Sequence, residues 1–265
     1  MTERNGTIRT ADDTDIYYEI HGGGPPMVMV AGLGDDHMSW ETQVKFFSNY
    51  FSVIAFDNRG IGKSSTPKGP YSVRQMAEDT HHLATSLDLS PVIAMGSSMG
   101  GAISQEWAIK YPDDIDQLIL TNTWAKRDAF TDALFDHWIS LANTGGGNHI
   151  VESLLVFCYS PAFLNSNPQV AADFLSLDAP RLDGFAAAAQ ACHDHHSIDR
   201  VQNIRHRTLV IAGEQDILTR AEFSQHLTDA MPNAEYTSFP TGHMVFWEMP
   251  DGFNERVAQF LKLSN

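Results

Sequence analysis

Short apolar runs are the feature that most constrains how this chain can fold. Five segments contain such a run, and they lie at 27–31, 51–56, 91–95, 116–122 and 208–213. Each has the length of a strand, and an uninterrupted apolar strand is typical of a sheet covered on both faces. Amphipathic segments alternate with the runs; in 72–89, for example, Met76, Leu83 and Leu87 share one stripe. This alternation predicts an α/β protein with a mostly parallel sheet.

Three further strands complete a predicted sheet of eight strands flanked by helices. Residues 15–22 alternate between apolar and polar side chains and follow a turn after 7–10, which predicts an N-terminal hairpin. The last strand is predicted at 234–240 and a final helix at 251–263. From 124 to 204 the strand pattern stops and helical pieces alternate with turns rich in Gly, Pro and Asn.

The simplest domain prediction is therefore one core domain with an insertion. The core consists of 1–123 and 205–265, and a helical cap at 124–204 interrupts it after the sixth strand. The chain has 265 residues, of which 43% are apolar, so it can bury a large core.

The charge balance limits the partners. The chain has 33 acidic and 17 basic residues, a formal net charge of −16, which repels phosphate backbones and anionic lipids. We therefore expect a small-molecule substrate, and neither nucleic acid nor a membrane as a partner. The first ten residues lack the apolar stretch of a signal peptide, so we expect a cytoplasmic protein; a homodimer is left open.

A run of small residues, AMGSSMGGA at 94–102, presents two candidate nucleophiles. Ser98 has Gly96 and Gly100 two positions away on either side, whereas Ser97 has methionines there. A nucleophile on a sharp strand-to-helix turn needs glycines at these two positions, because larger side chains would collide across the turn. The spacing therefore predicts that Ser98 is the nucleophile, between an apolar strand and a helix.

An activated serine also needs a base and an acid that orients it, and both are expected at the ends of later strands. Asp216 follows the strand 208–213, with Glu214 as the weaker alternative. His243 lies in a short loop after the last strand. Their order along the chain predicts a Ser98–His243–Asp216 triad.

Other polar or glycine-rich stretches are assigned no ligand. DNRGIGKSS at 57–65 resembles a phosphate-binding loop, but Asp57 occupies an obligatory glycine position, so a surface turn is predicted. HGGG at 21–24 precedes its strand, which makes AGLGDD at 31–36 the better oxyanion loop. CHDHH at 192–196 could bind a metal, but we predict a solvated helix end. No metal and no cofactor are predicted, and both cysteines are expected to be free, partly buried thiols.

With these residues in place, the sequence resembles the α/β-hydrolase fold family, and small serine esterases and enol-lactonases within it. The resemblance covers almost the whole chain and rests on GSSMGGA, FDNRGIGKSS, TLVIAGEQD and TGHMVFWEMP. It implies that the backbone N–H groups of Met99 and Leu33 hold the oxyanion. One departure is Ala31-Gly32, where the family often has His-Gly, so the usual packing of that loop is in question.

The predicted activity is hydrolysis of carboxylic esters or lactones through an acyl-enzyme, with a small apolar or aromatic substrate. Residues expected at the substrate pocket are Trp124, Phe130, Leu134, Trp138, Met244 and Phe246.

Two alternatives remain. SMGGA and Trp247 also resemble carbon–carbon bond hydrolases of the meta-cleavage type, although their oxyanion loop, rich in Gly, Ser and Pro, is absent. The chain could also be a small-ligand sensor that retains a triad, which turnover measurements would distinguish.

Overall fold

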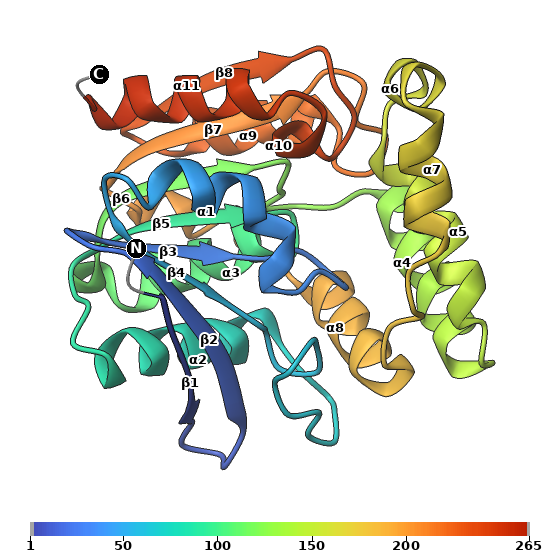
Figure 1. The fold of residues 1–265 in the computed structure, drawn as a ribbon, viewed down its shortest axis with the longest axis horizontal. Helices are drawn as coiled ribbons and strands as arrows, with labels where there is room; N and C mark the ends of the chain where they lie inside the picture. Colours follow the sequence, from blue (N-terminus) through green and yellow to red (C-terminus); the bar gives the residue numbers. More distant parts are fainter. Residues whose placement is uncertain (1–2, 264–265) are drawn as a thin grey trace.

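A mostly parallel sheet of eight strands forms the centre of the computed structural model, which describes residues 3–263 (Figure 1). The strand order is β1-β2-β4-β3-β5-β6-β7-β8. β1 and β2 are antiparallel to their neighbours, and all other pairs are parallel. The strands are β1 (Glu3–Arg9), β2 (Asp15–Gly22), β3 (Pro26–Val30), β4 (Ser52–Phe56), β5 (Val92–Ser97), β6 (Ile115–Thr121), β7 (Arg207–Gly213) and β8 (Ala234–Phe239). The predicted fold class and the N-terminal hairpin are confirmed.

Helices cover both faces of this sheet, which explains why its central strands are apolar throughout. α1 and α11 lie on one face, and α2, α3 and α9 lie on the other (Figure 1). The helices of the core are α1 (Glu41–Phe47), α2 (Val73–Ser86), α3 (Met99–Lys110), α9 (Ala221–Ala230), α10 (Val245–Glu248) and α11 (Pro250–Leu261). Short 3₁₀ turns are η1 (His37–Trp40), η2 (Pro112–Asp114) and η3 (Val201–Asn203).

Five helices lie between β6 and β7 in the described chain. They are α4 (Ala129–Asn143), α5 (Gly147–Cys158), α6 (Pro161–Ser166), α7 (Pro168–Leu175) and α8 (Leu182–Asp194). Figure 1 shows them beyond the carboxyl ends of the parallel strands, with α4 beside α8. This places a helical layer over the sheet edge where loops carry functional groups in open α/β folds.

Local sequence signals fix where two important helices begin. The Ser72 side chain accepts a hydrogen bond from the Gln75 N–H at 3.1 Å and caps α2. Asp128 does the same for α4 by accepting from the Thr131 N–H at 3.0 Å. Such caps satisfy N–H groups that have no partner within the helix. Among residues 3–263, no helix combines the length and apolar character needed to cross a bilayer.

Candidate active site

Ser98 occupies a strained turn between β5 and α3. Its backbone has φ 53° and ψ −118°, a conformation that L-residues rarely adopt and that costs about 1–3 kcal/mol. Two hydrogen bonds hold this turn: the Ser98 N–H donates to the Thr121 carbonyl at 2.9 Å, and the Thr123 hydroxyl donates to the Ser98 carbonyl at 2.8 Å. The surrounding structure therefore maintains the strain and keeps the serine at the tip of the turn.

The two glycines that flank the serine are required by close backbone contacts. A Cβ on Gly96 would lie 2.3 Å from the Gly100 carbonyl oxygen. A Cβ on Gly100 would lie 2.0 Å from the carbonyl oxygen of Val30 in β3. Both distances are far below van der Waals contact, so the spacing that selects Ser98 over Ser97 has a direct steric cause.

Asp216 and His243 are joined by a short hydrogen bond. The distance between Asp216 Oδ2 and His243 Nδ1 is 2.7 Å, and both side chains are buried. The other carboxylate oxygen, Oδ1, accepts from the N–H groups of Leu218 and Thr219 at 2.8 and 2.9 Å. These bonds hold the carboxylate against Nδ1, which places the ring proton there and leaves Nε2 as the basic nitrogen.

Glu214, the alternative acid, does not fit this geometry, and Asp216 is not the cap of the next helix. Glu214 is exposed and accepts a hydrogen bond from the Ser238 hydroxyl at 2.8 Å. Asp216 does not cap α9, because the N-cap residue of that helix is Arg220.

Two residues that sequence reasoning missed hold the acid and histidine loops together. Asn122, directly after β6, accepts from the Gly213 N–H at 2.7 Å and donates to the carbonyl of His243. The Thr219 hydroxyl lies 2.9 Å from Asp216 Oδ2 and 3.1 Å from His243 Nδ1. A polar residue directly after a buried strand is the available signal for Asn122, since strand ends meet at this edge.

The backbone donors predicted for an oxyanion belong to Met99 and Leu33. Met99 begins α3, and Leu33 lies in the loop after β3 and faces the same cavity as Ser98. Within residues 3–263, neither the Met99 N–H nor the Leu33 N–H has a hydrogen-bond partner. Free N–H groups at such positions are suited to bind developing negative charge.

The 57–65 segment supports the loop after β3 and is only in part the predicted surface turn: it forms turns, and Gly62 and Lys63 are exposed, but 57–61 are buried. Asp57 Oδ1 accepts from the backbone N–H of His37 at 2.7 Å and lies 2.7 Å from His37 Nδ1. Arg59 is buried and paired with Asp79 at 2.6 Å. The Asn58 amide donates to the Ala31 carbonyl at 3.1 Å, which fixes the position at which this chain lacks the family's usual histidine. The prediction missed the burial of these polar residues because their partners are distant in sequence.

One group of side chains has the composition of a cation site. Ligand atoms of Asp36, His37 and Asp57 lie within 4.8 Å of one another. Hydrogen bonds account for this arrangement: Asp57 Oδ2 also accepts from the Lys63 N–H, and Asp36 accepts from the Met38 N–H at the start of η1. Asp57 beside the imidazole raises the pKa of His37 and favours its charged form. The group therefore serves to hold the loop in place.

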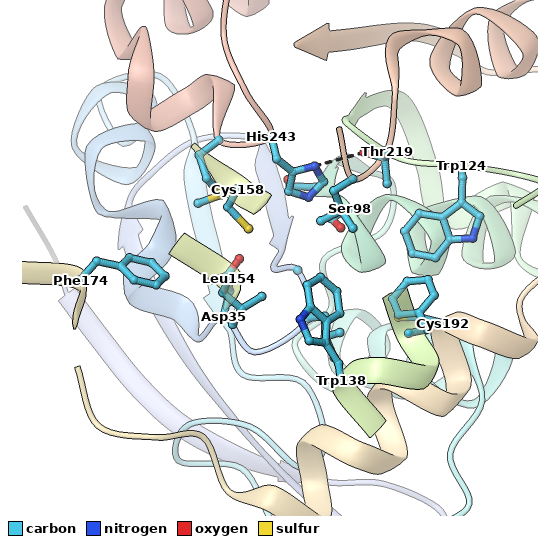
Figure 2. A pocket seen from close by; sticks show the side chains of 16 residues that line it. Asp35, Ser98, Trp124, Trp138, Leu154, Cys158, Phe174, Cys192, Thr219 and His243 are labelled. Carbon is cyan, nitrogen blue, oxygen red and sulfur yellow. Dashed lines mark hydrogen bonds between the residues drawn. The ribbon is translucent and has the colours of Figure 1, made fainter. Parts of the chain in front are cut away.

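A cavity in front of Ser98 encloses about 590 Å³ of space free of protein atoms, part of which is open to solvent. Its sheet-side wall consists of Gly32, Leu33, Asp35, Ser97, Ser98, Leu218, Thr219, His243 and Met244. Its helix-side wall consists of Phe135, Trp138, Leu154, Cys158, Phe174 and Cys192, with Trp124 between the two walls. Figure 2 shows Ser98 and His243 beside each other, with Trp138 below them and Trp124 to the right. The walls are mainly apolar, as is usual for sites that bind small molecules.

Three of the six residues predicted at the substrate pocket line this cavity: Trp124, Trp138 and Met244. The other three are corrected as follows. Phe130 is 47% exposed, and the Arg220 guanidinium lies 5.9 Å from its ring. Leu134 is buried but does not line the cavity.

Phe246 packs into the core, with its ring centroid 4.4 Å from that of Trp40. The helix α4 instead presents Phe135 to the cavity, because residues spaced by four drift gradually around a helix.

The histidines at 192–196 have different environments, so the predicted solvated helix end is only partly correct. His193 and His196 keep exposed surface, whereas His195 is buried with its Nδ1 3.6 Å from Glu106. Burial lowers the pKa of His195 to about 4 and keeps it neutral. Both cysteines are free and buried, and burial raises the pKa of each thiol, so neither is activated as a nucleophile.

Fold and site together define a class: an α/β protein with a serine on a strained strand-to-helix turn and a buried Asp–His pair at the same sheet edge. The chain belongs to the alpha/beta hydrolase fold family, whose model matches residues 25–250. The resemblance seen in the sequence motifs is thereby confirmed, and family membership supports hydrolase activity.

Individual relatives differ in the bond they cleave. RutD of Caulobacter segnis, named as a candidate carbamate hydrolase, is 30% identical over 93% of this chain and 96% of its own length. 3-Oxoadipate enol-lactonase 2 of Acinetobacter baylyi is 29% identical over 97% of this chain and 96% of its own. A solved thermophilic esterase from Thermogutta terrifontis matches with a TM-score of 0.90 and 26% identity, covering 98% of both chains. Similarity alone therefore leaves the type of bond open.

Proposed function

We propose that this protein hydrolyses small carboxylic esters or lactones through an acyl-enzyme on Ser98. The observation that carries the proposal is the arrangement of the site: a serine on a strained elbow and a histidine bonded to a buried carboxylate face one cavity. This is the arrangement that activates a hydroxyl as a nucleophile.

In the proposed reaction, His243 Nε2 takes the proton of the Ser98 hydroxyl as its oxygen attacks the substrate carbonyl. Asp216 keeps the imidazole oriented and stabilises its charged form. The N–H groups of Leu33 and Met99 hold the oxyanion. His243 then protonates the leaving alcohol, and a water molecule, deprotonated by His243, releases the acid and restores Ser98.

The cavity walls support a small substrate with an apolar part. Trp138, Phe135 and Leu154 offer apolar contact opposite the nucleophile, and no Lys or Arg lies among the residues that line the described cavity. Relatives named for ester and lactone cleavage support the same choice of bond. The similarity to RutD makes a small carbamate a second substrate class to include in any assay.

A panel of p-nitrophenyl esters, simple lactones and one aryl carbamate tests the proposal. We expect multiple turnovers on esters or lactones, and a loss of about 10⁴-fold or more in kcat for Ser98→Ala. The matched control is Ser97→Ala, which removes the adjacent hydroxyl and should keep most of the activity.

Loss of activity in Ser97→Ala but not in Ser98→Ala would overturn the assignment of the nucleophile. Tight binding of a small ligand with no turnover of any substrate would instead favour a sensor.

A further inference from the structure

Asp35 is the charged residue of the cavity that the proposed mechanism leaves without a task. It lies in the loop after β3, and its side chain faces the cavity from the sheet-side wall, beside Leu154 (Figure 2). Within residues 3–263, no hydrogen bond or ion pair reaches its carboxyl group. Its neighbour Asp36 differs, because its carboxylate accepts from the Met38 N–H at 2.8 Å and caps η1. Asp35 therefore has no comparable structural role.

The surroundings of this carboxyl group are unfavourable for a charge. Cys158, Leu154 and Trp138 line the same cavity, and no basic side chain other than His243 is among the lining residues described. Burial raises the pKa of Asp35 to about 6, and the nearby Asp36 adds to the rise while His243 opposes it. Asp35 is half-buried, and a partly desolvated carboxylate without protein partners binds donors, because a donor restores the interactions lost with water.

The distance between this carboxylate and the nucleophile is short enough for one small molecule to reach both. A methyl group placed on Gly32, which also lines the cavity, would lie 3.0 Å from Asp35 Oδ2 and 3.5 Å from Ser98 Cβ. One substituent close to a carbonyl bound at Ser98 can therefore contact Asp35.

We propose that Asp35 selects the substrate: its carboxylate binds a hydrogen-bond donor, above all an ammonium group, on the acyl part of the ester or lactone. By the same charge it excludes acyl parts that carry a carboxylate. The inference rests on the proposed function, because it takes the acyl part to lie between Ser98 and Asp35. The substrate class is thus a small ester or lactone with an amino or hydroxyl substituent one or two carbons from the carbonyl.

Four methyl esters of similar size test this preference, because their acyl parts carry no polar substituent, an ammonium, a hydroxyl or a carboxylate. They are methyl butyrate, methyl 3-aminopropionate, methyl 3-hydroxypropionate and monomethyl succinate. Hydrolysis is followed at pH 7.5, where both Asp35 and the amine are charged. For the wild type we expect kcat/KM to be about tenfold or more higher for the amino ester than for methyl butyrate, with the hydroxy ester between them and the succinate lowest.

Asp35→Asn should remove most of the amino preference and raise the rate on the succinate ester by about tenfold. Asp36→Asn is the matched control, since it removes the same charge from the adjacent residue outside the cavity lining and should keep the wild-type ratios. The proposal is overturned if the kcat/KM values of the three substituted esters relative to methyl butyrate are the same in Asp35→Asn as in the wild type, or change equally in Asp36→Asn.

Binding to Ser98→Ala, measured by calorimetry with the same four esters, separates this proposal from the proposed function. Turnover of methyl butyrate with ratios insensitive to Asp35 leaves the hydrolase standing and removes the selectivity. If no ester is turned over but Ser98→Ala binds the amino ester preferentially, and Asp35→Asn abolishes that preference, the selectivity stands and the hydrolase activity is removed. If Ser98→Ala and Ser98→Ala/Asp35→Asn bind all four esters equally, Asp35 does not select the substrate.

Discussion

The two walls of the cavity are built by different means. On the sheet-side wall, backbone geometry and hydrogen bonds hold the polar groups: Ser98 lies on a strained turn, and His243 is bonded to Asp216 and to the Asn122 amide. On the helix-side wall, apolar side chains from α4, α5, α7 and α8 provide surface, and the hydrogen bond from Trp138 Nε1 to Ser153 at 2.8 Å is the one that fixes the Trp138 indole. From this difference we expect the sheet-side wall to carry out the reaction and the helix-side wall to determine most of the choice of substrate.

The largest expected effect tests the chemical role of the sheet-side wall. Asp216→Asn should lower kcat by about 10⁴-fold, because an amide cannot hold the His243 proton on Nδ1. The measurement is kcat at pH 7.5 with the best ester of the panel. Glu214→Gln is the control, since this residue is exposed and bonded to Ser238, and its kcat should match the wild type. Comparable losses in both variants would contradict Asp216 as the orienting acid.

A second test concerns the backbone contact that shapes the elbow. Gly100→Ala would put a Cβ 2.0 Å from the Val30 carbonyl oxygen, and neither β3 nor α3 can move without disturbing the core. We expect the free energy of unfolding in urea to fall by about 3 kcal/mol. Gly23→Ala is the control, because nothing lies within 4 Å of a Cβ there. Equal urea midpoints for the two variants would show that the elbow tolerates a side chain.

The sheet-side wall is also the one that the sequence predicts. Glycine spacing identified Ser98, and the positions of Asp216 and His243 after late strands identified their loops, because parallel strands bring their carboxyl ends to one edge. Local sequence is sufficient here, since each group is positioned by its own strand and turn. Asn122 was missed although it directly follows β6, because its partners Gly213 and His243 are far away along the chain.

Helical periodicity predicts the helix-side wall less well. It shows which residues share a stripe, but not which edge of the stripe faces the cavity. Trp138 lines the cavity, as the stripe predicts, whereas Phe135 lines it in place of the exposed Phe130. The burial of charged residues at 57–65 was missed for a related reason. Arg59 is buried because it forms ion pairs with Asp79 and Asp12, and both are distant from it in sequence.

Asp35 differs from Ser98 and His243 on the sheet-side wall, because its proposed role is to select the substrate. Its carboxylate also lowers the stability of the folded protein by an amount that can be measured. With its pKa raised to about 6, the carboxyl group ionises more easily in the unfolded chain than in the folded protein. Stability therefore falls as the pH rises from about 4 through 6, and stays lower above that range. Asp35→Asn should increase the free energy of unfolding by on the order of 2 kcal/mol at pH 8, and the gain should vanish near pH 4.

Urea unfolding at pH 4, 6 and 8 measures this difference. Asp36→Asn serves as the control, because asparagine also caps helices and this carboxylate already has a partner; no comparable gain at pH 8 is expected. A stability difference for Asp35→Asn that stays constant from pH 4 to 8 would show that the carboxyl group is well solvated.

The smallest expected effect tests the helix-side wall. Trp138→Ala removes a large apolar surface from the cavity and should raise KM for an aryl acyl ester by about tenfold, with little change for an acetyl ester. Trp138→Phe keeps a ring in place and should restore most of the lost affinity, which distinguishes a contact with substrate from damage to α4. Phe130→Ala is the control on the same helix, since that side chain is exposed and outside the cavity. A uniform fall in kcat for both esters in Trp138→Ala would mean that α4 helps position the reacting groups, and the division between the two walls would no longer hold.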